Sequence, residues 1–330
     1  VERSAVPSFI PESGAIVEIR DAWLSACFDV DETKAEQVLT YALALYPAET
    51  VCLEILMKGL SEVGERWYGG EATVQQEHFA SELAMRRLEV LVAATPASTR
   101  PGRVLVGCAP EDQHTFPALL LTFLLKQRGW EVIYLGARVP ASHLHDTVMK
   151  AKPHLVVLTA QHLNTAAGLL DVAQKLQEDQ MALAFGGRIF NLNPDMRHRI
   201  PGHFLGERLE TAPQIIEQLL TSSAPLPHVE PISDKQQAAL AHFRERQVQL
   251  EAEIWQRAES MGLAPDHLSI ANEMLASDIT AALRLGDINY LRSDIQWIEG
   301  LLFNLDLPTE LLHHYLQAYL HAAQDLLDER

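Results

Sequence analysis

Short apolar runs alternate with helical patterns through the middle of the chain, and this alternation limits its fold more than any other feature. A strand buried on both faces reads as an unbroken apolar run. Strands that alternate with helices form βαβ crossovers, so the pattern predicts a parallel sheet. The runs span residues 103–108, 131–136, 155–159, 181–185 and 203–206.

Five parallel strands predict a doubly wound α/β sheet of the flavodoxin-like (Rossmann) type, and we expect it over residues 99–222. In such a sheet, ligands bind beyond the carboxyl ends of the first and third strands, where the strand order reverses. The loops that follow these strands are therefore the first place to look for chemistry.

The segment before the sheet is predicted to be helical almost throughout. Asp31 can cap a helix, Pro47 breaks one, and Gly69-Gly70 ends one. Helices of this length with short connections favour a four-helix bundle over residues 1–98. Its last three helices are expected to end near residue 45 and to span about 48–67 and 73–94.

A Pro-rich spacer at residues 222–233 separates the sheet region from a second helical segment, residues 234–330. A plain interpretation of this segment is a helical dimerisation or signal-transfer bundle. With it, the chain is expected to hold three domains. The four expected helices span about 234–261, 267–285, 287–304 and 308–329.

The charge balance excludes some classes of function. The chain of 330 residues has a formal net charge of −18, and more than half of that excess lies in residues 230–330. A strongly negative chain has no general attraction to phosphate backbones, so direct nucleic-acid binding is not expected. No apolar run reaches the roughly 18 residues of a membrane span, so no membrane contact is expected.

The cysteines and the amino-terminal residues predict a cytoplasmic protein. Cys27, Cys52 and Cys108 lie in apolar contexts without metal-binding spacing, which favours reduced core thiols. The chain begins without the basic and then apolar pattern of a signal peptide.

The loop after the first strand carries an Asp-x-His pair, Asp112 and His114. A carboxylate two residues before a histidine can accept a hydrogen bond from one ring nitrogen, which fixes the tautomer and leaves the other nitrogen for a metal. The alternative is a solvated loop histidine.

Two further strand ends carry candidate residues. Thr159 and Gln161 follow the third strand, where a hydroxyl can bond the polar tail of a ligand. Gly186-Gly187 follows the fourth strand, and two glycines let the backbone approach a flat group closely. The alternatives are an ordinary strand end and a simple turn.

In the bundle, Trp67 closes one helix, and Glu77-His78 lies early in the next. An aromatic plane beside a carboxylate and an imidazole suits a large ligand of mixed polarity. The alternative is a core tryptophan with a Glu-His pair on the surface.

Taken together, these residues resemble the cobalamin-binding module, a helical bundle followed by a flavodoxin-like domain. In that family an Asp-x-His-x-x-Gly loop supplies the lower axial histidine of cobalt. Asp112 and His114 match this motif, while Pro117 replaces its glycine, so the loop path differs from the family pattern. The resemblance implies that His114 binds cobalt.

The other strand ends extend the resemblance, which covers about residues 15–220. The family holds the nucleotide tail of cobalamin at a small hydroxyl and at a Gly-Gly pair. Thr159 takes the usual serine position, Gln161 lies in the same loop, and Gly186-Gly187 matches the glycine pair.

The bundle resembles the cap of adenosylcobalamin-dependent photoreceptors, which include light-responsive repressors of carotenoid synthesis. In that cap a Trp and a Glu lie against the adenosyl group; Trp67 and Glu77-His78 match them, and Glu65 matches a further polar contact. In the repressors a histidine directly after the Trp binds cobalt once light has removed the adenosyl group. Tyr68 stands there in this chain, so a bis-histidine light state by that route is not expected.

The last helices look similar to the globin-like, bilin-binding domain of photocobilins, which are cobalamin photoreceptors that also hold biliverdin. The resemblance implies a noncovalent bilin, since no cysteine follows Cys108. A histidine pair on a helix is otherwise typical of a solvated face. The residues expected to contact the bilin are Asp287, Tyr290, Arg292, Trp297, His313, His314 and His321.

These observations predict a photosensory protein, not an enzyme, that binds adenosylcobalamin and biliverdin and signals by a conformational or oligomeric change. Its expected partner is a downstream signalling protein or a fused effector outside this chain, and a homodimer is compatible with the sequence. One alternative is the corrinoid carrier of a methyltransferase system, which needs an accessible upper face. A scaffold with a degraded cobalamin site is another, supported only by Pro117 and Tyr68.

Overall fold

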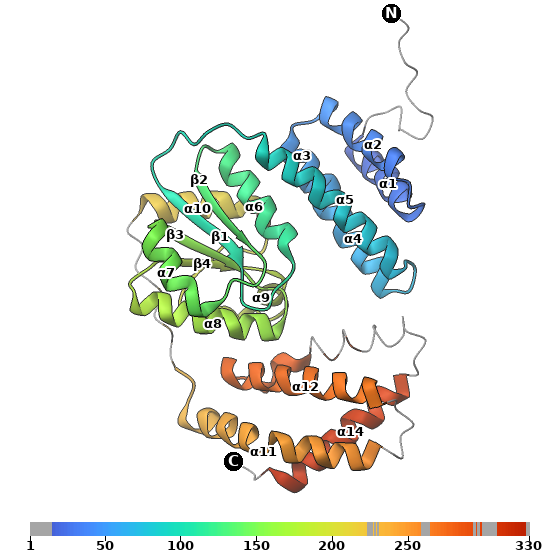
Figure 1. The fold of residues 1–330 in the computed structure, drawn as a ribbon, viewed down its shortest axis with the longest axis vertical. Coiled ribbons are helices and arrows are strands. Elements are labelled where there is room, and N and C mark those ends of the chain that lie inside the picture. The colour runs from blue at the N-terminus through green and yellow to red at the C-terminus, as the bar shows by residue number, and fades with distance from the viewer. Residues whose placement is uncertain are drawn as a thin grey trace, which may run out of the picture. The chain divides into compact units, whose positions relative to one another are not determined.

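The computed structural model describes residues 15–222, 231–258, 265–292 and 309–327, together with the single residues 227, 229, 295 and 298. They form two compact units, of which the first takes in Val1–Pro101 and Leu119–Glu131, and the second Gly102–Ala118 and Val132–Arg330. The boundary therefore falls inside helix α6, Thr115–Gln127 (Figure 1).

The first unit is helical, as predicted. Asp31 caps α2 by accepting a hydrogen bond from the Lys34 N–H at 2.9 Å, and Thr73 and Gln76 form a reciprocal capping box at the start of α5. Outside α6, its helices are α1 (Ile16–Phe28), α2 (Glu32–Leu45), α3 (Ala48–Val51), the π-helical segment η1 (Cys52–Met57), α4 (Lys58–Tyr68) and α5 (Val74–Ala93).

The expected helix over 48–67 differs from the structure in one respect, because its middle part, η1, is π-helical. A π-helical turn adds a residue to the turn and so rotates the side chains that follow it. The apolar pattern alone does not reveal such a local change of helix type.

A close approach of α1 and α4 stabilises this bundle. Trp23 of α1 is fully buried, and a Cβ atom on Gly59 of α4 would lie only 2.6 Å from its ring. The glycine therefore lets the indole pack directly on the α4 backbone. Gly64 lies in the same helix with nothing within 4 Å of its own Cβ position.

The second unit contains the predicted parallel sheet, in the order β2-β1-β3-β4-β5. This order confirms the doubly wound, flavodoxin-like prediction. The strands are β1 (Arg103–Cys108), β2 (Glu131–Gly136), β3 (Leu155–Thr159), β4 (Leu183–Gly186) and β5 (His203–Phe204). The connecting elements are α7 (Ala141–Ala151), α8 (Leu163–Glu178), α9 (Arg188–Leu192), η2 (Pro194–Arg199), η3 (Leu209–Thr211) and α10 (Ala212–Thr221).

Two strand predictions were wrong at their ends. The fourth strand starts at Leu183 and not at Met181, because the Met181 N–H bonds back to the Leu176 carbonyl of α8 at 2.8 Å. The fifth strand is shorter than 203–206 and holds two residues, with the Leu205 N–H still bonded to the Phe185 carbonyl at 2.9 Å.

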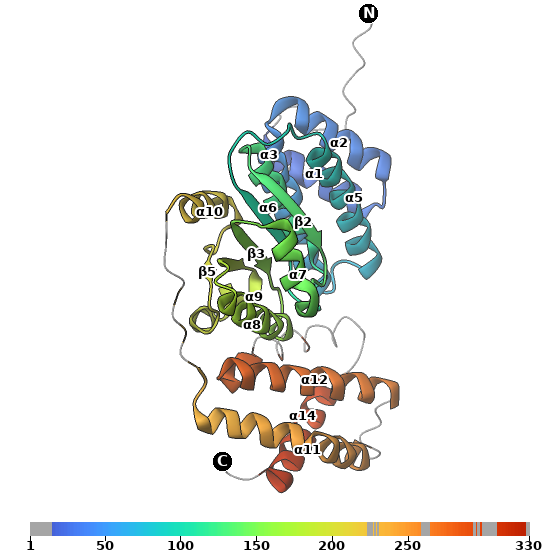
Figure 2. The ribbon, with the colours of Figure 1, turned by 60° about the vertical axis from the view of Figure 1, so that its left-hand side comes forward.

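Helix α8 lies between the sheet and the C-terminal helices, as both views show (Figures 1 and 2). Ala281, Ala282 and Leu285 of α12 are buried in the same core as α8 and the sheet. Arg284 pairs with Asp171 of α8 and donates to the Ala167 carbonyl at 3.1 Å. The sheet and α12 thus share one continuous core.

The C-terminal helices also have a core of their own, built from α11 (Asp234–Ala258), α12 (Pro265–Leu285) and α14 (Thr309–Leu326). The expected third helix over 287–304 begins with the short turn η4 (Ile288–Tyr290), and most of it lies outside the described residues. Whether this segment is globin-like stays a prediction.

The three cysteines are buried and unbridged, which agrees with the predicted core thiols. Burial raises the pKa of the Cys27 and Cys52 thiols to about 12. Within the part of the chain that the structure describes, every helix is too short or too polar to cross a bilayer.

The Gly59 contact yields a matched pair of substitutions. Gly59→Ala should lower the free energy of unfolding by about 1–3 kcal/mol, because the new methyl group collides with the Trp23 ring. Gly64→Ala should raise it by up to about 1 kcal/mol, since alanine favours the helix and meets no neighbour. Urea denaturation of the two variants measures both values, and equal effects would contradict the packing described.

Candidate functional site

The carboxyl ends of three strands lie level with one another. Cys108 at the end of β1 is the register partner of Thr159 in β3, and Thr159 is the partner of Gly186 in β4. The loops that leave these strands are therefore neighbours at one edge of the sheet. The sequence placed its candidate residues in these three loops, and the structure brings those loops together.

Asp112 is the central residue of this edge. Its side chain is 0% exposed, and its Oδ1 accepts the backbone N–H of His114 and lies 2.9 Å from His114 Nδ1. Its Oδ2 accepts the backbone N–H of Gln161 at 2.7 Å, and its carbonyl accepts the Arg138 N–H at 2.9 Å. One residue thus connects the loops after β1, β2 and β3.

The hydrogen bonds decide the charge of Asp112. Burial by itself would raise the pKa of this carboxyl, but the bonds from His114 and from the Gln161 backbone favour the ionised form, and the net pKa is lowered. An ionised carboxylate only accepts hydrogen bonds, so the His114 Nδ1 that faces it carries the proton. In the neutral ring, Nε2 then keeps its lone pair.

His114 itself is accessible, with a side chain that is 54% exposed. Its ring lies beside that of His162, with the centroids 4.9 Å apart and the planes tilted by 56°. Burial first, and then the nearby His114, lower the pKa of His162. An exposed imidazole with a fixed tautomer is the arrangement found in metal-binding histidines.

The loop after β4 is tied to the loop after β3. Gln161 accepts the Arg188 N–H through its Oε1 at 3.0 Å. Gly187 has a φ of +130°, and a Cβ there would lie 1.9 Å from the Ala160 carbonyl oxygen, so glycine is required by the neighbouring loop itself. A Cβ at Gly186 would meet Leu205 at an ordinary contact distance of 4.0 Å. Of the pair, Gly186 is therefore the one that tolerates a small side chain.

The Thr159 side chain is buried, and its hydroxyl group has few hydrogen-bond partners. It is 5% exposed, and its Oγ1 has no hydrogen-bond partner of the usual N or O kind in the described structure. It does interact with the Cys108 thiol, whose pKa burial raises to about 11. A buried hydroxyl without a full set of partners is costly unless a ligand or water completes it.

The bundle candidates lie where α4 ends and α5 begins. Trp67 is half-buried, and Glu65 is exposed. Glu77 accepts a hydrogen bond from Ser81 at 2.8 Å and lies 3.7 Å from the ring of His78, whose side chain is 74% exposed. Their proximity to a cofactor stays a prediction.

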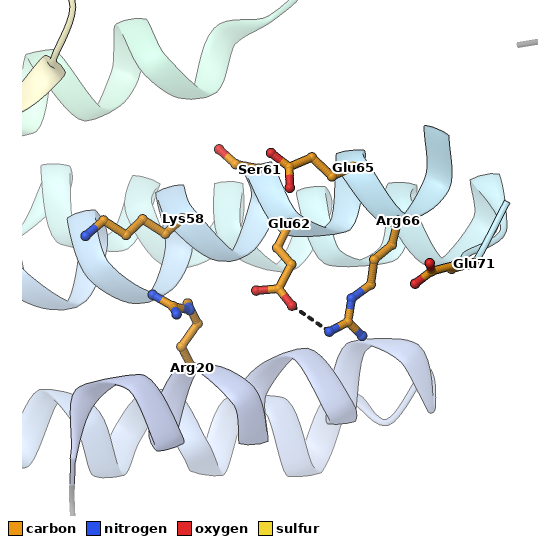
Figure 3. Close-up of a pocket in the computed structure, with 7 residues that line it drawn as sticks. All are labelled: Arg20, Lys58, Ser61, Glu62, Glu65, Arg66 and Glu71. Atoms are coloured by element: carbon orange, nitrogen blue, oxygen red, sulfur yellow. Dashed lines mark hydrogen bonds and ion pairs between the residues drawn. The ribbon is translucent and has the colours of Figure 1, made fainter. Parts of the chain in front are cut away.

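A polar groove of about 590 Å³ lies between α1 and α4 (Figure 3). Two of its cations are already paired, Lys58 with Glu54 at 2.6 Å and Arg66 with Glu62 at 2.5 Å. Glu65 lines this groove, whereas Trp67 does not. Its charged lining suits water better than a large ligand with an apolar face. The full lining is Arg20, Lys58, Ser61, Glu62, Glu65, Arg66 and Glu71.

The C-terminal candidates are dispersed in the structure. Tyr290 is 7% exposed and packs in the core of the sheet, and Asp287 accepts the Asn289 N–H at the turn before it. The other described ones are all exposed: Arg292, His313, His314 and His321. Trp297 lies outside the described residues. Tyr290 thus belongs to the core of the sheet, whereas the three histidines lie on the surface of α14.

Sequence reasoning did not single out His162, Arg138 or Arg188. His162 directly follows Gln161, so its position after the third strand was visible, but its contact with His114 depends on the order of the strands. Arg138 and Arg188 contribute backbone N–H groups, and a backbone group leaves no signal in a sequence.

Comparison with known families agrees with this geometry. Residues 19–92 match a family model described as a B12 binding domain, and residues 102–216 match a second model with the same description. The second match contains the whole sheet edge around Asp112 and His114.

Two curated relatives and one solved structure are similar to this chain. The HTH-type transcriptional repressor CarH of Myxococcus xanthus is 33% identical over 48% of this chain and 53% of its own length. The methanol–corrinoid protein of Methanosarcina barkeri is 28% identical over 39% of this chain and 50% of its own. The chain thus spans about half the length of these relatives.

The structure of the Methanosarcina barkeri monomethylamine corrinoid protein superposes with a TM-score of 0.55. At 22% identity it covers 62% of this chain and all of that one, which supports the shared fold. Residues 19–92 and 102–216 are therefore B12-binding domains, and the chain is homologous to the repressor CarH.

Proposed function

We propose that this protein is a light sensor that binds adenosylcobalamin, with His114 as the lower axial ligand of cobalt. The observation that carries the proposal is the Asp112 carboxylate, which holds His114 Nδ1 at 2.9 Å and leaves Nε2 available. Homology to CarH supports adenosylcobalamin as the form of the cofactor.

The residues present fit a corrinoid. Within the described residues, no group of three or more His, Cys, Asp or Glu side chains could hold a bare metal ion. A corrin ring provides the equatorial ligands of its cobalt, so one protein histidine is enough. The Thr159 hydroxyl, which has no N or O partner in the described structure, and the backbone at Gly186, which carries no side chain, suit the polar nucleotide tail.

Adenosylcobalamin, when bound, supplies a Co–C bond that visible light breaks. His114 would supply the nitrogen ligand of cobalt, while Asp112 keeps the tautomer of the imidazole. Trp67, Glu77 and His78 cover the upper ligand, with Glu65 as a further polar contact. These bundle residues would lose their contacts with the upper ligand after photolysis, and the balance between two packings of the protein would then shift.

The signal passes to a protein partner in this proposal, and the chain has no catalytic role. The net charge of −18, concentrated in the last hundred residues, disfavours a nucleic-acid partner for this segment. The conformational change would be recognised by a signalling protein, a fused effector or a second copy of the chain.

A corrinoid carrier of a methyltransferase system is the second candidate, favoured by the similarity to the methanol–corrinoid protein. A carrier needs an open upper face for methyl transfer, and a tryptophan over that face obstructs it. Methylation of the bound cobalt by a partner enzyme, followed by transfer to an acceptor, would favour the carrier over the sensor.

Reconstitution with adenosylcobalamin tests the sensor. Green light should change the absorption spectrum of the loaded protein. His114→Ala should alter that conversion, and Asp112→Asn should weaken cobalamin binding by roughly tenfold or more, since it removes the partner of the ligand. His143→Ala, an exposed histidine on α7, is the matched control and should behave as the wild type. The proposal would be contradicted if the loaded protein showed no photoconversion, or if His114→Ala converted in the same way as the wild type.

We also propose that residues 234–330 hold a biliverdin-type bilin, as in photocobilins. The proposal rests on the resemblance alone, because both B12-binding matches end before this segment. Expression with and without a source of biliverdin tests it. A red absorption band beyond the cobalamin bands, present only with the source, is expected, and identical spectra from the two preparations would contradict it.

A further inference from the structure

A second histidine lies against the proposed cobalt ligand. The rings of His114 and His162 are 4.9 Å apart at their centroids and tilted by 56°. His162 is partly buried, whereas the side chain of His114 is 54% exposed. The more buried ring therefore lies against one side of the more exposed one.

Hydrogen bonds of the residue before His162 and of a residue after it hold the His162 backbone in place. The residue before it, Gln161, donates its backbone N–H to Asp112 Oδ2 at 2.7 Å. His162 is also the N-cap residue of α8, and its N–H and carbonyl bond to the Thr165 hydroxyl at 3.1 and 2.9 Å. The same carboxylate thus binds His114 directly and anchors the loop that carries His162.

One hydrogen bond does not fix the plane of an imidazole. The contact between His114 Nδ1 and Asp112 sets the position of one nitrogen, and the Cβ–Cγ bond limits the ring further, but small changes in χ1 and χ2 remain open to a side chain that is 54% exposed. A flat side chain packed against the ring removes this remaining freedom. The direction of the Nε2 lone pair depends on the ring plane, so the packed ring decides where His114 can bind a metal.

We propose that His162 is a positioning residue, whose ring packs on His114 and holds its imidazole plane for cobalt binding. The inference rests on the proposed function and adds a residue that acts through His114. The contribution comes from the flat shape of the side chain, so phenylalanine should replace it and leucine, of similar volume but without a plane, should not.

Electron paramagnetic resonance of the full chain loaded with cob(II)alamin tests this. Protein labelled with ¹⁵N-histidine, compared with unlabelled protein, shows whether a protein imidazole binds the cobalt, through the nitrogen splitting. The fraction of histidine-bound cobalt and the apparent Kd for cobalamin are measured for wild type, His162→Leu, His162→Phe, His114→Ala and the control His143→Ala.

We expect His162→Leu to lose much of the histidine-bound fraction and to bind cobalamin about threefold to tenfold more weakly, in line with the strength of aromatic pairs. His162→Phe and His143→Ala should stay close to wild type. Thermal unfolding of each variant separates this effect from misfolding, and if His162→Leu does not fold, a histidine-bound fraction in His162→Phe equal to wild type supports the inference.

Three results would overturn the inference. His162→Leu with the wild-type signal and affinity shows that the ring is dispensable. An equal loss in His162→Phe and His162→Leu shows that the plane is not what matters. A label-sensitive signal that survives in His114→Ala shows that a histidine other than His114 binds cobalt. A wild-type protein without any label-sensitive signal instead overturns the proposed function, and this inference with it.

Discussion

The sheet edge depends on one buried charge, the Asp112 carboxylate. Removing a carboxylate from water is costly unless hydrogen bonds replace its hydration. Here His114 and Gln161 supply these bonds from two different loops, at 2.9 and 2.7 Å. The same bonds that stabilise the charge therefore hold the two loops together and set the position of His114 Nδ1.

Helix α8 connects this edge with the C-terminal helices. It begins directly after His162, and its residue Asp171 pairs with Arg284 of α12. A helix transmits displacements along its axis because its backbone hydrogen bonds keep it stiff. The described structure thus contains a continuous physical connection from the Asp112 network to α12, through packed side chains and one ion pair.

Much of the fold was predictable because its signals are local. Asp31 and Gly69 act within one helical turn of their own positions, and the helix start and the helix end that they predict appear there. The strand ends were harder to predict. Met181 lies in an apolar run that is typical of a strand. Its N–H, however, donates to the Leu176 carbonyl near the end of helix α8. The π-helical segment η1 was also not predicted, since an apolar pattern does not show which carbonyl accepts each backbone N–H.

By itself, the sequence determined the βαβ order, the helical segments on either side, and the loops in which Asp112, His114, Thr159 and Gln161 stand. Only the tertiary structure decided that Asp112 bonds to a residue 49 positions away, and that the rings of His114 and His162 meet. It also decided that α12 shares a core with α8. The physical reason is that these contacts depend on which strands and helices become neighbours, and packing of the whole unit sets that order, while capping and periodicity act only over short stretches of chain.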